Sequence, residues 1–428
     1  MKVSNRSVEK AFTVAVLFLS TSALQSKLLD LSSVQTITDG SPLMKAIWAC
    51  VYLVVAVYVA RHRREIGAII RANRLLFLLV ALAIISTAWS PAPAVTIRRS
   101  IGLGFTTLFG VYFCSRYQIR EQLKLLGSVL AATIVLSVFA ELFVPSMFPP
   151  VDPLSLGGWN GVFLQKNDFG RVLALMAVVM TVCARRSRKT TFFYTAGLLA
   201  LLIVIAKTES RTALLITVVM VLAITAFSGV RWKRRTLVTL GPAFALVTLL
   251  LVFAGISFRS ELAGLMGRDM RLTGRTEIWN LSLAAIAQRP ILGYGYSAFW
   301  SGSEEGARVR QLVGWEVPNA HNGYIETALD LGIVGFLVCF VAYGVAIRRA
   351  VAYVRNNSGN EAKWPLAYML FTLLYCTTES AFLASNSIVW ILFSAATCYV
   401  SLPLVRESRG VDVPQTVDSG PPYLPLEV

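Results

Sequence analysis

Long apolar runs that alternate with short basic segments are the feature of this sequence that most constrains its fold. The apolar runs extend for about 15 to 23 residues, enough to cross the hydrocarbon core of a bilayer as a helix. Lipid offers a backbone no hydrogen bonds, so a spanning segment must be a helix or part of a closed barrel. These runs are continuous rather than alternating, which favours helices. We therefore predict an all-α polytopic membrane protein and exclude a soluble domain or a barrel.

About 12 transmembrane helices follow from the spacing of these runs. We place them at residues 11–26, 43–60, 74–89, 100–115, 123–144, 169–184, 191–206, 212–230, 236–256, 324–347, 364–384 and 387–402. The first run follows Lys2, Arg6 and Lys10, as in a signal peptide, but no small-residue cleavage site comes after it. We interpret it as a retained first span.

Four parts of the chain follow from these spans. Residues 1–256 hold spans one to nine, 257–323 form one long loop with an amphipathic helix, and 324–402 hold the last three spans. Residues 403–428 contain two adjacent prolines and no periodicity, which predicts a disordered tail.

The positions of Lys and Arg indicate the orientation. About 25 of the 40 fall in alternate connections, and an excess of Lys and Arg marks cytoplasmic loops. Both termini and the tail are therefore predicted to be cytoplasmic, and the long loop periplasmic. The net charge of +17 reflects this topology and does not indicate nucleic-acid binding. The six cysteines fall within apolar runs without metal-ligand spacing, so we expect buried thiols.

The remaining basic residues bear on function because topology does not require them on the outer side. Arg98, Arg99, Lys166, Arg211 and His321 lie where spans begin at that side. A helix N-terminus offers unpaired N–H groups and the positive end of a dipole, and Arg or Lys beside it favours a phosphorylated ligand. The alternative is that single cations extend to the head groups of outer-leaflet lipids.

His321 is the candidate for proton chemistry. It is one of two histidines, and the other, His62, lies in a basic run that resembles a cytoplasmic anchor. Imidazole titrates near neutral pH and is the commonest general base. The alternative is that His321 caps a helix or makes interfacial hydrogen bonds. Asn322 and Glu326 are four residues apart on one helical face, where they can position a sugar. Glu379 is a further polar candidate, or else a structural hydrogen-bond partner between helices.

Polar motifs on the outer side carry a family resemblance. They include a glycine-rich segment at 157–171, a charged turn at 208–212, and a predicted amphipathic helix at 275–288 with Ile278, Leu281 and Ala285 on one face. The motifs Thr273–Trp279, Pro290–Gly295 and His321–Glu326 resemble the signature of the O-antigen ligase and O-antigen polymerase superfamily. The motifs at 163–169 and 210–211 resemble its exopolysaccharide-polymerase branch, of the succinoglycan type. The resemblance runs from about residue 157 to 387 and is strongest over 270–335.

The resemblance implies a GT-C-like fold and an inverting glycosyltransferase that needs no metal and no cofactor. Its site would face the periplasm, in the inner membrane of a bacterium. The donor would be an oligosaccharide on undecaprenyl pyrophosphate, and the acceptor a sugar hydroxyl. Membrane lipid and a polysaccharide co-polymerase that regulates chain length are the other expected partners, and no nucleic acid is expected.

Residue chemistry agrees with these roles. Arg211 and Arg275 would stabilise the leaving pyrophosphate, since the chain has no Asp-x-Asp motif for a divalent metal. His321 would orient or deprotonate the acceptor hydroxyl. The predicted substrate-binding residues are Lys166, Asn167, Arg98, Arg99, Asn322, Tyr324, Glu326 and Glu379.

Two functions compete with that of a polysaccharide polymerase. An O-antigen ligase, which transfers glycan to lipid A–core, differs in the acceptor alone, so the sequence leaves both open. A twelve-span transporter predicts two repeated halves and a long central cytoplasmic loop. Here that connection is short, at 185–190, and the long loop is on the outer side, which disfavours a transporter.

Overall fold

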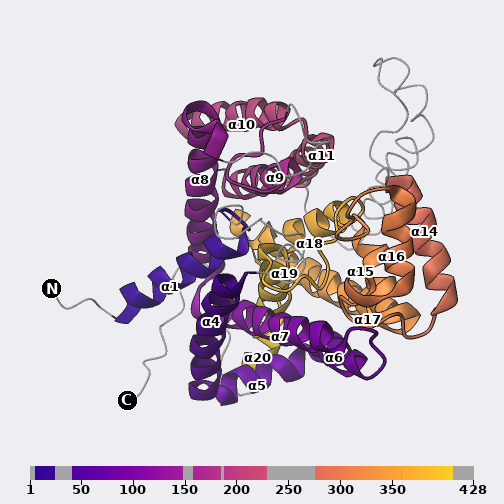
Figure 1. Ribbon diagram of the computed structural model, residues 1–428. Helices are drawn as coiled ribbons and strands as arrows, with labels where there is room; N and C mark the ends of the chain where they lie inside the picture. The colour runs from indigo at the N-terminus through magenta and orange to yellow at the C-terminus, as the bar shows by residue number, and fades with distance from the viewer. Residues whose placement is uncertain are drawn as a thin grey trace.

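The computed structural model describes residues 5–24, 41–147, 158–184, 188–228, 275–357 and 359–407, and these residues form helices without strands. Figure 1 shows α8, α9, α10 and α11 side by side, and α14, α15, α16 and α17 grouped elsewhere. The helices are α1 (Asn5–Ser20), α4 (Pro42–Arg61), α5 (Arg63–Ala72), α6 (Arg74–Ile85), α7 (Pro93–Arg116), α8 (Ile119–Phe143), α9 (Lys166–Cys183), α10 (Arg188–Thr208), α11 (Arg211–Ser228), α14 (Arg275–Gln288), α15 (Phe299–Gly302), α16 (Glu304–Val313), α17 (Gly323–Asn356), α18 (Trp364–Tyr375), α19 (Ile388–Tyr399) and α20 (Leu402–Glu407).

Several helices are able to cross a membrane. By length and composition α4, α8, α10 and α17 qualify, and α5 with α6 forms a fifth candidate that is bent by 93°. Large apolar side chains such as Phe139 on α8 and Phe192 and Phe193 on α10 are exposed, as lipid-facing residues are. The chain is an integral membrane protein. The count of about 12 spans stays a prediction, and the span expected at 236–256 lies outside the described residues.

Close packing of small residues holds the bundle together. Gly110 of α7 lies against α19, where an added Cβ would approach Ser394 Cβ to 2.6 Å. Gly170 of α9 lies against α11, where a Cβ would approach that of Ala213 to 2.7 Å. Membrane helices associate through such contacts because lipid provides no hydrophobic drive between them. The α9–α11 crossing brings the N-terminal ends of these two helices together.

The helix α5 corrects one prediction. The basic segment between the second and third spans was expected to be a connecting loop, but residues 63–72 form an amphipathic helix. Its apolar side chains Ile66 and Ile69 are buried, while Arg63, Arg64 and Arg71 are exposed. Spacing of three residues between the isoleucines places them on one face, which explains the helix.

The helix α17 is broken at Gly332, and the break receives the loop that follows α14. Gly332 has φ 62° and ψ −163°, a conformation that glycine alone adopts readily. Before the break, Tyr294 N donates to Leu329 O at 2.8 Å, and directly after it Ile333 N donates to Pro290 O at 2.8 Å. Backbone groups released by the break are therefore satisfied by the loop. This docking fixes the loop against the start of α17, where His321 lies.

A second apolar core lies under α14, α15 and α16. Ile278, Tyr294, Phe299 and Trp300 are buried in it. The helix α14 occupies the predicted range 275–288, with Ile278 and Ala285 buried and Leu281 half-buried. This core supports the N-terminal end of α14, which carries Arg275.

Helix ends differ from the predicted spans in places that matter for the site. The span expected at 364–384 is shorter, since α18 ends at Tyr375 and residues 376–387 form turns. α7 begins at Pro93 rather than near 100, because proline is favourable in a first helical turn. Arg98 and Arg99 therefore lie within α7 and do not precede it.

Two further predictions need correction. Cys50 and Cys183 are exposed rather than buried, whereas the other four cysteines are buried. The tail expected to be disordered from 403 begins as part of α20, which packs on α5. The remainder of the tail, and residues 257–274 of the long loop, lie outside the described residues.

Candidate functional site

The carboxylate of Glu379 joins three segments that are distant in sequence. Its Oε1 accepts from Arg275 at 2.8 Å and from Asn167 Nδ2 at 3.1 Å, and its Oε2 lies 3.2 Å from His321 Nδ1. The side chain is only 12% exposed. Three predicted site residues therefore donate to the buried carboxylate of a fourth.

Turns after α18 place Glu379 in this position. The hydroxyl of Thr377 donates to Leu374 O at 2.7 Å, and Glu379 N donates to Tyr375 O at 3.0 Å, which tightens the chain as the helix ends. Burial raises the pKa of a carboxyl group, but His321 and Arg275 outweigh this effect and hold the pKa of Glu379 below its ordinary value. The residue is therefore a carboxylate that accepts hydrogen bonds and donates none.

His321 is held in one orientation by its neighbours. Its φ of 47° lies in the left-handed region, and Asn319 Oδ1 accepts from its backbone N–H at 2.8 Å. Because the Glu379 carboxylate can only accept, Nδ1 of His321 carries the proton of this hydrogen bond. In the neutral imidazole Nε2 is then an acceptor, and it forms no hydrogen bond within the described residues. A residue oriented in this way has the geometry of a general base.

Asn322, Tyr324 and Glu326 have partners within the protein. Asn322 caps α17, as its Oδ1 accepts from the backbone N–H of Tyr324 at 3.0 Å. The Tyr324 hydroxyl donates to Leu373 O at 2.9 Å. Glu326 accepts from Trp300 Nε1 at 3.0 Å and from the backbone N–H of Ala320 at 2.7 Å. These bonds fix the backbone beside His321.

The N-terminal ends of α9 and α11 are linked directly. The hydroxyl of Ser210, which precedes α11, donates to Asn167 Oδ1 at 2.9 Å. Asn167 therefore bridges Ser210 and Glu379. Lys166 lies 4.0 Å from Glu209, a long ion pair, and Arg211 is exposed at the first position of α11. Lys166 and Arg211 thus lie at the same two helix ends that Asn167 and Ser210 connect.

A cavity of about 240 Å³ opens beside this cluster. Of the predicted site residues, His321 and Glu379 line it. Asp168, Arg171 and Tyr375 line it as well, although they were not among the predicted site residues. Arg171 and Asp168 pair at 2.9 Å, and Arg171 Nε is buried without a hydrogen bond in the described part of the chain. The cavity therefore combines an oriented imidazole with a guanidinium.

Sequence signals for the additional residues exist in part. Asp168 and Arg171 are three apart at the start of a helix, a spacing that places both on one face. Arg98 and Arg99 do not line the cavity, and α7, which carries them, packs against α19, α4 and α6. Ser210 was not among the predicted site residues. It caps α11, since it accepts from Ala213 N at 3.4 Å, and it also holds Asn167.

One family model and two curated proteins match parts of this chain. Residues 196–340 match the family model described as O-Antigen ligase. The matched domain contains Arg211, Arg275 and His321, while the carboxylate that joins two of them lies beyond its end.

Two curated relatives extend the likeness. The chain is 25% identical over 276 residues to the exopolysaccharide production protein ExoQ of Rhizobium meliloti (strain 1021), a match that covers 61% of this chain and 62% of that protein. It is 26% identical over 141 residues to an uncharacterized protein of Haemophilus influenzae, covering 31% and 34%. The chain thus spans less than two thirds of the length of either relative.

Proposed function

We propose that this protein is a polysaccharide polymerase. It transfers oligosaccharide repeat units from a lipid pyrophosphate onto a sugar hydroxyl, at the periplasmic face of a bacterial inner membrane. The observation that carries the proposal is the Glu379 junction: its carboxylate binds His321 and Arg275, and His321 and Glu379 line a small cavity. The likeness to an exopolysaccharide production protein favours polymer growth over other uses of such a site.

The reaction we propose is a single displacement at the anomeric carbon of the donor. The acceptor hydroxyl oxygen attacks this carbon, and the bond from the carbon to the pyrophosphate oxygen breaks. His321 Nε2 takes the hydroxyl proton, while Glu379 stabilises the imidazolium that forms. The lipid pyrophosphate leaves as an anion, and the configuration at the carbon inverts. No metal is required by this scheme.

Fixed cations stabilise the charge that develops on the pyrophosphate. Arg171 is the arginine that lines the cavity, and its Nε is buried and unbonded among the described residues. Arg275 contributes positive charge beside Glu379, and Arg211 and Lys166 lie at the adjoining helix ends. Preorganised donors of this kind are worth roughly two to three orders of magnitude in rate each.

Three single substitutions test the assignment in a strain that lacks this gene. His321→Ala, Arg275→Ala and Arg211→Ala should abolish high-molecular-weight polysaccharide and cause single repeat units to accumulate on lipid. The matched control is His62→Ala, since His62 stacks on Tyr58 at 4.3 Å where α4 meets α5 and should be dispensable. Each variant is first shown to reach the membrane at the parental level. Normal polymer in all three variants would reject the site.

A ligase is the second candidate, because the matched domain bears that description. The same strains distinguish the two. A ligase predicts polymer that forms normally on lipid carrier while lipid A–core remains unmodified. A polymerase predicts that only single repeats remain on the carrier. Interaction with a chain-length-regulating co-polymerase is a further expectation of the polymerase and is testable by cross-linking in cells.

A further inference from the structure

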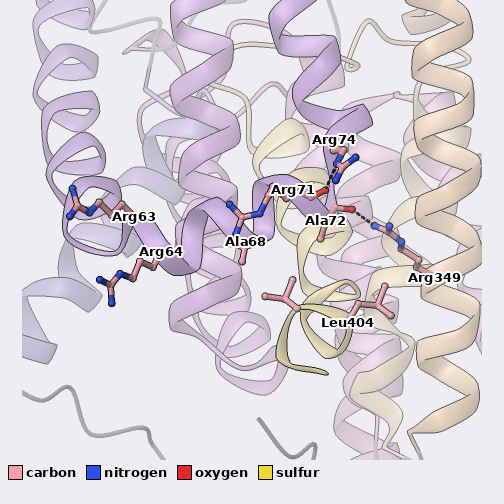
Figure 2. A pocket seen from close by; sticks show the side chains of 9 residues that line it. Arg63, Arg64, Ala68, Arg71, Ala72, Arg74, Arg349 and Leu404 are labelled. Carbon is pink, nitrogen blue, oxygen red and sulfur yellow. Dashed lines mark hydrogen bonds between the residues drawn. The ribbon is translucent and has the colours of Figure 1, made fainter. Parts of the chain in front are cut away.

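A large basic cavity lies at the junction of α5, α6, α17 and α20. It has a volume of about 810 Å³ and is lined by Arg63, Arg64, Arg71, Arg74 and Arg349. Figure 2 shows these side chains together with the apolar residues that line the same cavity. None of these arginines belongs to the Glu379 junction, so the proposed glycosyl transfer does not explain the cavity.

Hydrogen bonds between distant segments hold the wall of the cavity in place. Arg349 Nη1 donates to Ala72 O at 2.9 Å (Figure 2). It also donates to Asn73 Oδ1 at 3.1 Å, and the two bonds tie α17 to the α5–α6 junction. Asn73 Nδ2 in turn donates to Ser401 Oγ at 2.8 Å, beside α20. The wall of the cavity is therefore held in place by specific hydrogen bonds between helices.

The positive charge of the cavity is not neutralised by the protein. Among the described residues, none of its arginines forms an ion pair, and no acidic side chain lines it. Glu65, the acidic residue of α5, lies outside the lining. The guanidinium groups of Arg63, Arg64 and Arg71 make no hydrogen bond within the described residues. Grouped guanidinium ions repel one another, and a bound anion relieves that repulsion.

The place of the cavity in the fold indicates where the anion comes from. α4 is long and apolar enough to cross a membrane, and α5 begins two residues after it ends. α5 then runs at 93° to α6, as expected for a helix that lies at the membrane surface. Leu404 is 50% exposed at the cavity, and Ala68 and Ala72 add further apolar lining. A lining of both arginines and apolar residues matches a lipid, whose phosphate contacts guanidinium groups and whose acyl chains contact apolar side chains.

We propose that this cavity binds the phosphate head group of an anionic membrane lipid, with the arginines contacting the phosphate oxygens and the lipid chains lying against Leu404 and Ala68. Several guanidinium groups favour a head group with two phosphates over one with a single phosphate. The site is separate from the glycosyl-transfer site and does not depend on the function proposed for it.

Native mass spectrometry of the purified full-length protein in detergent tests the proposal, with cardiolipin as the probe and phosphatidylcholine as the neutral reference. The test variant is Arg63→Gln/Arg64→Gln/Arg71→Gln, which removes the guanidinium groups that have no protein partner. We expect cardiolipin affinity to fall on the order of 100-fold, given the attraction between anionic lipid and each Arg.

The matched control removes the same charge elsewhere at the same ends of α4 and α17. Arg61→Gln/Arg348→Gln/Arg355→Gln changes three exposed arginines that do not line the cavity. A cardiolipin affinity of this control variant within a few-fold of that of the parent protein supports the proposal. An equal loss in both triple variants would show attraction to net charge alone and would overturn it. Inorganic pyrophosphate that binds as tightly as cardiolipin, with the same dependence on Arg63, Arg64 and Arg71, would overturn the lipid source.

Discussion

Replacing Glu379 by Gln separates the charge of the junction from its shape. Gln keeps a carbonyl oxygen that can accept from Arg275 and Asn167, as Oε1 does now at 2.8 and 3.1 Å. Its NH₂ group then lies where Oε2 accepts from His321 at 3.2 Å. A donor now faces a donor, so the imidazole must move its proton to Nε2. In that tautomer Nε2 cannot receive a proton from the acceptor hydroxyl.

The magnitude follows from the loss of general-base catalysis. A positioned base contributes about 10² to 10⁴ in rate, so Glu379→Gln should lower polymer formation by that factor. The assay is polymer formed by purified protein in proteoliposomes supplied with lipid-linked repeat units. Glu141→Gln serves as the matched control, because Glu141 is likewise a hydrogen-bonded carboxylate, which accepts from backbone N–H groups at 2.8 and 2.6 Å, but does not contact His321.

A double-substitution cycle gives the refuting result. If Glu379 acts through His321, adding Glu379→Gln to His321→Ala should lower the rate by less than about threefold further. A loss in that background as large as in the parent would show that Glu379 acts independently of His321. Full activity of Glu379→Gln would show that the imidazole orientation is irrelevant to the reaction.

Two further substitutions test the break in α17 and the Glu379 junction. Gly332→Ala should destabilise the purified protein by about 3 kcal/mol, because φ 62° and ψ −163° suit glycine alone and a Cβ would overlap the Ile291 carbonyl. The control, Gly344→Ala, lies in open space on the same helix and should leave the melting temperature unchanged or raise it. Equal melting temperatures of the two variants would contradict the account of the break. Asn167→Asp places a second carboxylate where Nδ2 lies 3.1 Å from Glu379, so polymer yield should fall by about tenfold or more with normal membrane levels, whereas unchanged yield would remove Asn167 from the site.

Local pattern was enough to predict some elements. The amphipathic helix at 275–288 was predicted from the spacing of its apolar residues, and α14 occupies that range. The gathering of polar residues at helix N-terminal ends was also visible in the sequence. Asn167, Arg275 and His321 lie within or just before a first helical turn, and the structure brings them to one carboxylate.

Other features depended on tertiary contacts and were not predictable from pattern. The apolar run at 364–384 resembles a full span, yet α18 ends at Tyr375 so that Glu379 can meet its donors. The basic run at 61–74 resembles a loop because its charges are dense. Residues 63–72 form a helix because two isoleucines on one face pack on the surface that α4, α6 and α20 provide.

The Glu379 junction also sets an order of events in biosynthesis. Its donors lie 212, 104 and 58 residues earlier in the chain than the acceptor. Ribosomes deliver the acceptor last, after α9, α14 and α17 have emerged. The nascent protein therefore has no assembled junction until Glu379 has emerged after α18, and a shorter nascent chain cannot carry out the transfer proposed for this site.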